Sequence, residues 1–138
     1  MEISDELYET YSELIKIKGE CSCKLIDELN MSELTLRQIE YIKKFDRCDY
    51  VTTSELAKIL ELSKPSVTEM IKKFIKLECI YKQKCNEDGR VYYLHLTEKG
   101  RCIARFEELT VRKLVDRILD SLEEDEIKTL ISLLSKIK

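Results

Sequence analysis

The segment from Thr52 to Leu96, TTSELAKILELSKPSVTEMIKKFIKLECIYKQKCNEDGRVYYLHL, decides the fold. Two apolar patterns with helical spacing are separated by Glu61-Leu62, and two short runs rich in β-branched and aromatic residues follow. Ser63 is placed to cap the second helix, with Pro65 in the first turn, where its missing N–H costs nothing. Two short helices joined by a tight turn form a helix-turn-helix, and a hairpin directly after them forms a wing.

The second of these helices should run from Ser63 to about Glu78. Its expected buried stripe is Val67, Met70, Ile71 and Phe74. Strands are predicted over residues 80–84 and 91–96, with a turn at 86–89 because Asn, Asp and Gly favour turns. The pattern predicts a mainly α protein with a small β-hairpin wing.

Further helices flank this segment. A helical pattern covers about residues 5–29, and Thr35-Leu36-Arg37-Gln38 reads as a capping box that begins a helix with an apolar stripe of Leu36, Ile39, Ile42 and Phe45. After the wing, Thr97 should cap a long helix with apolar positions through Ile118. A capping box at Ser121-Leu122-Glu123-Glu124 should begin the last helix.

Composition limits the function classes. The 138 residues fit one domain, no apolar run approaches the ~20 residues of a membrane span, and the acidic N-terminus lacks a signal-peptide core. We therefore expect a cytoplasmic protein whose six cysteines are mostly reduced thiols. One histidine, no glycine-rich phosphate loop and no Cys-x-x-Cys motif argue against an enzyme, a cofactor and a metal site.

Charge is distributed unevenly along the chain. The net charge is −3, but residues 58–105 hold 11 Lys/Arg and 6 Asp/Glu, a net of +5, and the remainder carries −8. One basic segment on an acidic chain suits a localised phosphate-binding face, although a chance excess of solvated lysines would look the same.

The outward face of the second helix carries short polar and cationic side chains that suit base edges and phosphates in a major groove. Glu69 is the exception, since a carboxylate is repelled by phosphates unless it accepts from a cytosine amine. In the wing, an arginine at the tip suits the minor groove, and Asp88 is placed to pair with it. The candidate DNA-binding residues are Lys64, Ser66, Thr68, Glu69, Lys72 and Lys73 in the helix, and Lys82, Lys84, Asp88 and Arg90 in the wing.

Residues 34–100 resemble the core of the MarR family of winged helix-turn-helix transcriptional regulators. Each matching string is short, and their order and spacing together carry the resemblance. The strings are Leu34-Thr35, Thr53-Ser54-Glu55-Leu56-Ala57, Leu62-Ser63 with Ser66-Val67-Thr68, Asp88-Gly89-Arg90, and Leu96-Thr97-Glu98-Lys99-Gly100.

The resemblance implies a homodimer on double-stranded DNA. Residues 1–33 and 101–138 would be dimerisation helices and 34–100 the DNA-binding lobe. It also implies repression at a pseudo-palindromic operator, with release by a small ligand or by thiol oxidation. Two residues depart from the family pattern: Glu69 stands where a basic residue is common, and Cys79 where glycine is usual, so Cys79 would be strained if that position needs a positive φ.

Alternatives stay open. The string from Ser66 to Lys73 also resembles metal-dependent repressors of the DtxR type, but the single histidine, His95, lies on a wing strand, where a surface or hydrogen-bonded role is expected rather than metal ligation. A winged-helix protein-interaction module without DNA binding would suit the acidic total charge and Glu69.

Two features bear on what such a regulator senses. Cys21 falls on an apolar helix stripe, where one interpretation is a small packing residue. Cys102 lies in the first turns of the helix after the wing, which the resemblance places near the first helix, so a Cys21–Cys102 pair or an intersubunit thiol site is the alternative and the two are candidate redox thiols. A small aromatic effector would suit a pocket between the dimerisation region and the DNA-binding lobe, and its candidate lining is Tyr8, Tyr11, Tyr41 and Tyr50. Tyr8 and Tyr11 also fit a plain role in helix packing.

Overall fold

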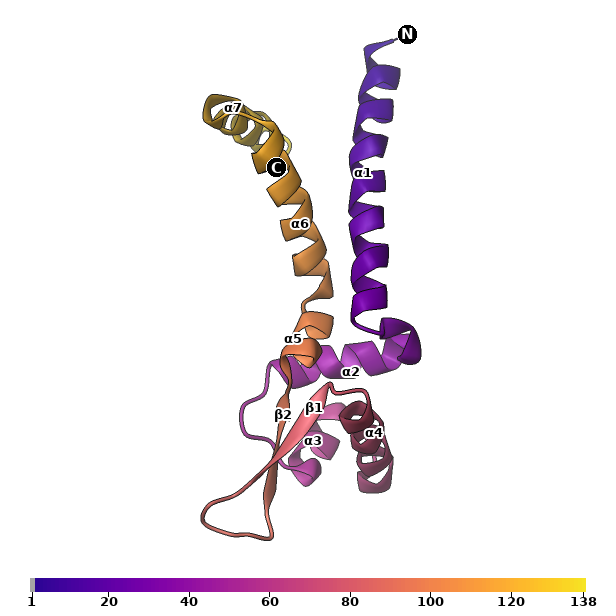
Figure 1. Ribbon diagram of the computed structural model, residues 1–138, viewed down its shortest axis with the longest axis vertical. Coiled ribbons are helices and arrows are strands. Elements are labelled where there is room, and N and C mark those ends of the chain that lie inside the picture. Colours follow the sequence, from indigo (N-terminus) through magenta and orange to yellow (C-terminus); the bar gives the residue numbers. More distant parts are fainter. Residues whose placement is uncertain (1) are drawn as a thin grey trace. The chain divides into compact units, whose positions relative to one another are not determined.

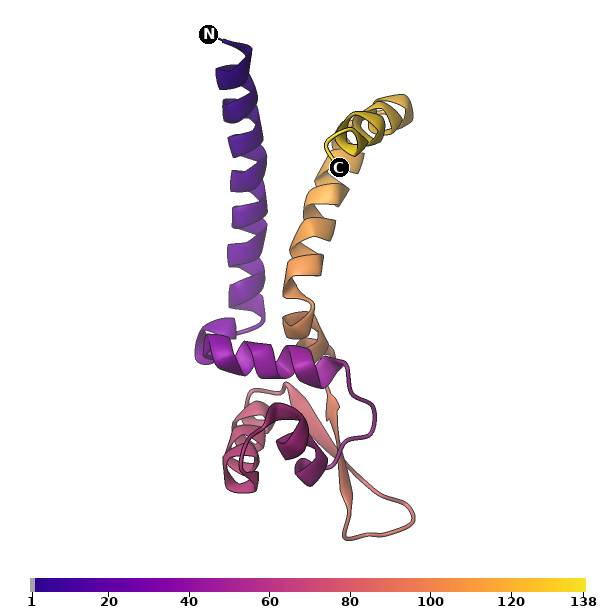
Figure 2. The same ribbon diagram turned by 180° about the vertical axis from the view of Figure 1, so that it is seen from behind.

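The computed structural model describes residues 2–138 and is mainly helical, with one two-stranded antiparallel hairpin (Figures 1 and 2). The fold class predicted from the sequence is confirmed. The elements in chain order are α1 (Ile3–Glu28), a 3-10 turn (Met31–Glu33), α2 (Leu36–Asp46), α3 (Thr53–Leu60), α4 (Lys64–Lys76), β1 (Ile80–Lys84), β2 (Tyr92–Leu96), α5 (Glu98–Ala104), α6 (Phe106–Ser121) and α7 (Glu124–Ser135).

The chain divides into two compact units. Residues 26–106 form the winged-helix unit, which contains α2 to α5 and the hairpin. Residues 2–25 and 107–138 form the terminal-helix unit, made of most of α1 with α6 and α7. In the described residues no helix is both long and apolar enough to cross a membrane.

The core of the winged-helix unit is built on the apolar stripe of α4. Val67, Met70, Ile71 and Phe74 are all buried, as their spacing predicted. Helix α4 contacts α3 and β1, which hold it in place. Each fully buried side chain of this size stabilises the fold by about 1.5–3 kcal/mol. The other buried apolar side chains of this unit include Ile42, Phe45, Leu56, Leu60, Ile80, Leu94 and Ile103.

The hairpin is anchored at its base. Ile80 pairs with Leu96 and Lys84 with Tyr92, so the two strands are in register along their whole length. A short bridge joins the base to the segment before α3, where Leu94 N donates to Val51 O over 2.8 Å. Ile80, Leu94 and Leu96 are buried, and β1 otherwise faces solvent.

Local signals explain where several helices begin. Gln38 N donates to Thr35 Oγ1 and Thr35 N to Gln38 Oε1, so the capping box predicted for α2 is present. Thr52 and Thr97 cap α3 and α5 through the amides of Glu55 and Gly100.

Three local expectations were wrong. Leu36 is 85% exposed rather than part of the buried stripe, because the first turn of α2 lies outside the core. The long helix after the wing breaks at Arg105, which separates α5 from α6. Ser121 ends α6 instead of capping α7, and the cap of α7 is Glu123, whose amide donates to Glu126 Oε1.

The terminal-helix unit leaves many apolar side chains exposed. Leu7 and Tyr11 on α1 and Val111 and Val115 on α6 form apolar stripes at helical spacing, and all four are exposed in the single chain. The same holds for Ile131, Leu134 and Ile137 at the C-terminal end of the chain. Three helices alone cannot cover these stripes, so the unit presents apolar surface along α1, α6 and α7.

Candidate nucleic-acid interface

The helix-turn-helix is set by α3 and α4. A left-handed residue, Glu61 (φ 56°), ends α3, and Leu62 N donates to Ala57 O, which turns the chain within three residues. Ser63 then caps α4: Ser66 N donates to Ser63 Oγ, and Ser63 Oγ donates to Ser66 Oγ over 2.8 Å. The predicted cap is present, and it engages the hydroxyl of Ser66, which the sequence had suggested for contact with DNA.

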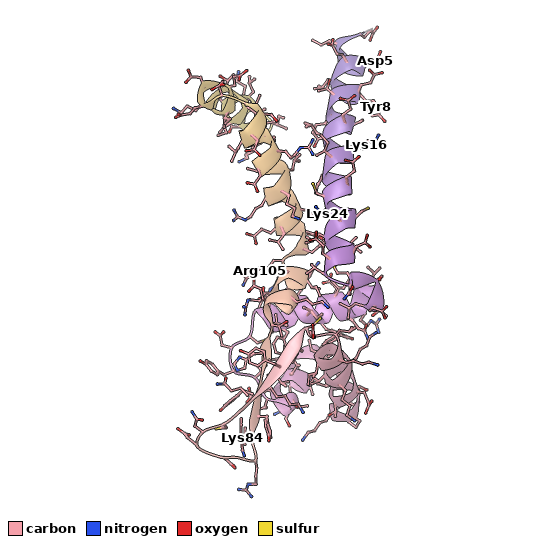
Figure 3. The ribbon with its side chains drawn as sticks, in the orientation of Figure 1. Asp5, Tyr8, Lys16, Lys24, Lys84 and Arg105 are labelled. Atoms are coloured by element: carbon pink, nitrogen blue, oxygen red, sulfur yellow. The ribbon has the colours of Figure 1, made fainter. Side chains whose placement is uncertain are left out.

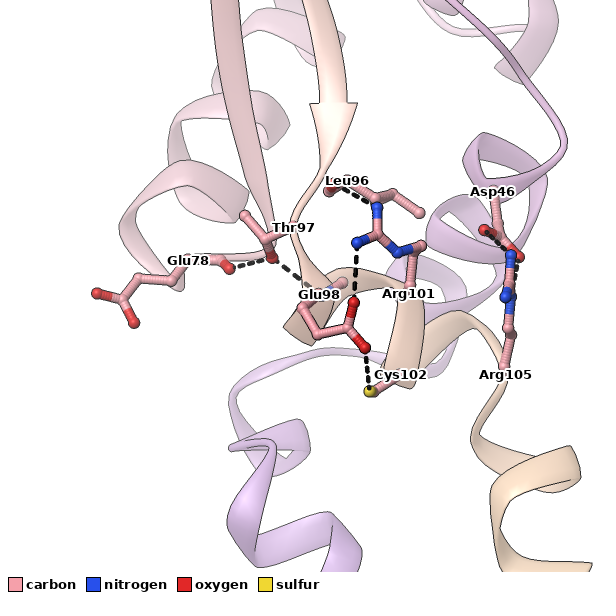
Figure 4. A network of polar contacts seen from close by, with 9 residues as sticks. Asp46, Glu78, Leu96, Thr97, Glu98, Arg101, Cys102 and Arg105 are labelled. Atoms are coloured by element: carbon pink, nitrogen blue, oxygen red, sulfur yellow. Dashed lines mark hydrogen bonds and ion pairs between the residues drawn. The ribbon is translucent and has the colours of Figure 1, made fainter. Parts of the chain in front are cut away.

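The C-terminal end of α4 is fastened to the segment Leu96–Gly100. The chain leaves the helix through Glu78 in the left-handed conformation (φ 61°), and Cys79 N donates to Phe74 O over 2.8 Å. Thr97 Oγ1 donates to Glu78 O (Figure 4), and Lys99 Nζ donates to Leu77 O. A lysine at this end also suits the negative pole of the helix dipole.

Gly100 completes this fastening. A Cβ atom placed on Gly100 would lie 2.2 Å from the carbonyl oxygen of Cys79, so the two backbones approach as closely as they do because residue 100 has no side chain. The amide of Thr97 donates to that same carbonyl over 2.9 Å. The segment Leu96-Thr97-Glu98-Lys99-Gly100 therefore positions the end of α4 against the start of α5.

The expected strain at Cys79 is not found, because the residue with positive φ is the preceding Glu78. Cys79 is instead buried beneath this junction, where its thiol donates to Leu77 O over 3.7 Å. Burial raises the pKa of the Cys79 thiol, and the nearby Lys99 acts in the opposite direction with a smaller effect.

An open groove of about 470 Å³ joins α3, α4 and the wing. It brings together four residues that the sequence singled out, namely Lys64, Thr68, Lys82 and Arg90. Three of the four are cationic, and among the described residues no carboxylate lines the groove. The N-terminus of α3 opens into it, so backbone amides add to the positive potential. The remaining lining residues are Thr52, Thr53, Ser54, Val91 and Tyr92.

Sequence reasoning missed Thr52, Thr53 and Ser54 as site residues. Their hydroxyls at a helix start indicated only a cap, although the N-terminus of a helix is also a favourable place for an anion. The helix start was therefore visible in the sequence as a possible anion site. The approach of the wing to this end of α3 was not, because it depends on residues far apart in the chain.

The wing tip carries the predicted pair. Arg90 Nε and the Arg90 backbone amide both donate to Asp88 Oδ1, over 3.3 and 3.0 Å. The Arg90 side chain is nevertheless 93% exposed, so Asp88 directs the guanidinium without covering it. Lys84 lies close to the tip, with its Cε 2.9 Å from the position of a Cβ on Gly89 (Figure 3).

Other predicted residues lie outside the groove lining. Glu69 and Lys72 form an exposed ion pair of 3.1 Å on α4, which reduces the repulsion that the Glu69 carboxylate alone would exert on a phosphate. Lys73 is turned toward α2, where its Nζ donates to Gln38 Oε1 over 2.9 Å. Lys73 therefore fixes α4 to the capping box of α2.

The candidate redox cysteines are free thiols, as are the other four cysteines. Cys21 lies in the terminal-helix unit and Cys102 in the winged-helix unit, and both are half-buried. Cys102 Sγ lies 4.0 Å from Glu98 Oε1 (Figure 4).

The tyrosines of the expected aromatic pocket lie in different surroundings. Tyr8 and Tyr11 are exposed on α1, and Tyr50 lines a separate pocket with Tyr81 and His95. His95 is half-buried, and its Nε2 atom is buried with no hydrogen-bond partner among the described residues. Among the residues that the structure describes, no group of three or more His, Cys, Asp or Glu side chains could hold a metal ion.

Comparison with known proteins agrees with this geometry. The model of the MarR family matches residues 34–92, which span α2, α3, α4 and most of the wing. An uncharacterized HTH-type transcriptional regulator of Bacillus subtilis (strain 168), YpoP, is 27% identical over 113 residues, which are 81% of this chain and 79% of YpoP. The helix-turn-helix and wing segment of this chain is therefore similar to the MarR family.

Solved structures share the fold. The complex of MepR from S. aureus with DNA has a TM-score of 0.55 at 18% identity, and the match covers 96% of each chain. FabT from Streptococcus pneumoniae, solved in complex with DNA, has a TM-score of 0.54 at 21% identity, and the match covers 97% of this chain and 94% of FabT. The family match selects the MarR resemblance over the DtxR one, and MarR family proteins are winged-helix regulators rather than enzymes.

Proposed function

We propose that this chain is a MarR family regulator that binds double-stranded DNA with the groove between α3, α4 and the wing. The observation that carries the proposal is the convergence of Lys64, Lys82 and Arg90, from three different segments, on one groove whose described lining holds no carboxylate. A phosphate backbone is recognised by such cationic groups together with helix N-termini, while short side chains such as Thr68 reach base edges.

In this proposal the residues divide by role. Thr68 on α4 contacts the major groove, Lys64, Lys72 and Lys82 contact phosphates, and Arg90, directed by Asp88, enters the minor groove. Lys84 adds charge near the wing tip. Ser66 acts through the cap of α4, and Lys73 through its bond to Gln38, so both position the recognition helix.

The working unit is a homodimer in which the terminal-helix unit is the interface. Its exposed stripes on α1, α6 and α7 provide the apolar surface that a stable dimer buries. A two-fold dimer presents two copies of the groove, which suits a pseudo-palindromic operator. The neighbours MepR and FabT were each solved bound to DNA, which supports the same activity for this chain.

The regulator acts as a repressor that leaves its operator when a small aromatic ligand binds or a thiol is oxidised. Cys21 and Cys102, which are both free and half-buried, are the candidate thiols. Equal operator affinity before and after mild peroxide treatment would remove the thiol branch of this proposal.

Selection of bound sites from random DNA tests the proposal. The purified full chain should enrich a two-fold symmetric sequence, and its affinity should fall steeply as salt rises, since each neutralised phosphate contributes about −0.9 to the slope of log K against log salt. A matched arm under oxidising conditions reports on the thiols. No enrichment and no salt dependence would reject DNA binding.

A protein-interaction module is the second candidate. The exposed Glu69–Lys72 pair on the recognition helix favours it, because it places a carboxylate on the face that would meet DNA. In that case Glu69→Lys would create DNA affinity in a protein that had none, whereas in a DNA-binding regulator it would change the preferred sequence.

A further inference from the structure

The outward face of α4 carries an ion pair at its centre. With 3.6 residues per turn, Glu69 and Lys72 each lie about 150° around the helix from the centre of the buried stripe, one on either side of the line opposite to the core. Lys72 Nζ is 3.1 Å from Glu69 Oε1, and the Lys72 and Glu69 side chains are 67% and 74% exposed. The pair therefore projects from the part of the helix that lies farthest from the core.

Glu69 also lies at a suitable height along the helix. Helix α4 runs from Lys64 to Lys76, and Glu69 is in its second turn. In a helix-turn-helix, residues in the N-terminal part of the recognition helix are those that contact base edges. A side chain at position 69 is thus placed for a base contact when α4 enters a major groove.

Several other polar groups on this face are already bonded within the protein. The Ser66 hydroxyl takes part in the cap of α4, and Thr68 Oγ1 donates to the carbonyl oxygen four residues earlier over 2.9 Å. Lys73 Nζ donates to Gln38 Oε1. The Glu69 carboxylate differs, because its hydrogen-bond partner in the described residues is an equally exposed side chain one turn along the helix.

The Glu69 carboxylate retains most of its accepting capacity. An ionised carboxylate has about four lone-pair sites on its two oxygens. The Lys72 ammonium uses one of them on Oε1, and in the described residues no group donates to Oε2. The ammonium also offsets the negative charge, so the carboxylate can approach DNA with less repulsion from the phosphates.

This acceptor-only group matches one base better than the others. In the major groove guanine presents acceptors alone, and thymine presents an acceptor and a methyl group, so neither can donate to a carboxylate. Adenine and cytosine each present an amine. The adenine amine lies beside the N7 acceptor, which repels a carboxylate, whereas the cytosine amine lies beside a C–H group. Cytosine is therefore the base whose edge suits Glu69.

We infer that Glu69 accepts a hydrogen bond from the N4 amine of one cytosine in each half of the two-fold operator, while Lys72 connects the carboxylate to the phosphate backbone. The inference rests on the proposed function and adds the base that the recognition helix selects. Glu69 is in this sense a specificity-determining residue, since base contacts select the sequence and phosphate contacts position the protein.

Glutamine at the same position provides a direct test. Glu69→Gln keeps the shape, but its amide both donates and accepts, which is the pattern that pairs with adenine N6 and N7. Sites selected from random DNA by the purified full chain should contain a cytosine in each half, and Glu69→Gln should replace that cytosine by adenine. Glu40→Gln is the matched control, because Glu40 forms the same i,i+3 pair with Lys43, over 3.2 Å, on α2. It should select the parent sequence.

A modified base isolates the hydrogen bond. N4-methylcytosine pairs with guanine as cytosine does, but its methyl group replaces the hydrogen that faces the major groove. Placed at the selected position in one half of the operator, it should weaken binding of the parent chain and of Glu40→Gln about tenfold, as loss of a base contact does. Glu69→Ala has no carboxylate to lose and should bind modified and unmodified DNA equally.

The outcomes separate this inference from the proposed function. No binding to any DNA would reject the proposed function, and this inference would fall with it. Binding to a site whose selected bases do not change with Glu69→Gln would overturn this inference alone, as would equal effects of N4-methylation on the parent chain and Glu69→Ala. A uniform gain in affinity for all sequences on loss of the carboxylate would do the same, because Glu69 would then only repel phosphates.

Discussion

Lys99 Nζ lies 2.8 Å from the carbonyl oxygen of Leu77, so a side chain of α5 holds the C-terminal end of the recognition helix. Lys99→Met keeps the aliphatic stem but removes this bond and the favourable charge. We expect it to lower the free energy of unfolding by about 1 kcal/mol. Urea denaturation measures the change. Lys16→Met, at an exposed position in the middle of α1, is the control and should change stability little.

Arg90 should contribute more to DNA affinity than any other wing residue. Arg90→Ala removes an exposed guanidinium group, and we expect operator binding to weaken by about 1–3 kcal/mol. Asp88→Asn, which keeps the shape but loses the charge that directs Arg90, should weaken it less. Fluorescence anisotropy with the selected operator measures both. Arg112→Ala, on α6, is the control, and an effect equal to that of Arg90→Ala would contradict the wing's role.

Two neighbouring lysines should behave differently. Lys72 is exposed, whereas the Nζ of Lys73 is engaged with Gln38. We predict that Lys72→Met lowers the salt slope of DNA binding by about one per protomer, and that Lys73→Met leaves the slope unchanged. Lys73→Met should instead lower the free energy of unfolding. Reversal of the two results would show that Lys73 leaves Gln38 to contact a phosphate.

The exposed stripe of α6 should be required for dimerisation. Val115→Asp places a charge where the proposed interface is apolar, and we expect dissociation into monomers at micromolar concentration. Ile59→Asp is a closely matched control, since Ile59 is 43% exposed and Val115 is 44% exposed, but Ile59 lies on α3. Sedimentation equilibrium separates the outcomes, and a dimer that survives Val115→Asp would place the interface elsewhere.

Stability should decline in alkaline solution. The pKa of the Cys79 thiol is raised by burial, that of Cys48 by burial and by Asp49, and that of Tyr93 chiefly by Cys85. The unfolded cysteines ionise near their ordinary value of 9.0 while the folded ones keep their protons. Folded protein then binds more protons than unfolded protein, so the free energy of unfolding falls as pH rises.

This decline can be attributed by substitution. Denaturation between about pH 8 and pH 9.5 should show a shallower decline for Cys79→Ala than for the parent chain, whatever the absolute stability of the variant. Cys23→Ala removes an exposed thiol and serves as the control. Parallel curves for all three proteins would exclude Cys79 as a source of the pH dependence.

Several features decided by nearby residues were predictable from the sequence, although the cap expected at Ser121 was not. The capping box of Thr35 and Gln38, the buried stripe of α4 and the pairing of Asp88 with Arg90 each depend on residues within a few positions of one another. Features that depend on distant contacts were not. Neither the bond from Lys73 to Gln38 nor the break at Arg105 has a local signal, since no proline or glycine marks residue 105.

Gly100 limits how this chain can vary. In a library of random codons selected for operator binding, position 100 should return glycine alone, because any side chain would collide with the Cys79 carbonyl and displace the end of α4 from the start of α5. Gly19 has nothing within 4 Å of the place that a Cβ would occupy, and it should tolerate alanine and larger residues. Gly19 can therefore be replaced. Gly100 sets the distance between the backbone at Cys79 and the start of α5, on which the proposed binding of DNA depends.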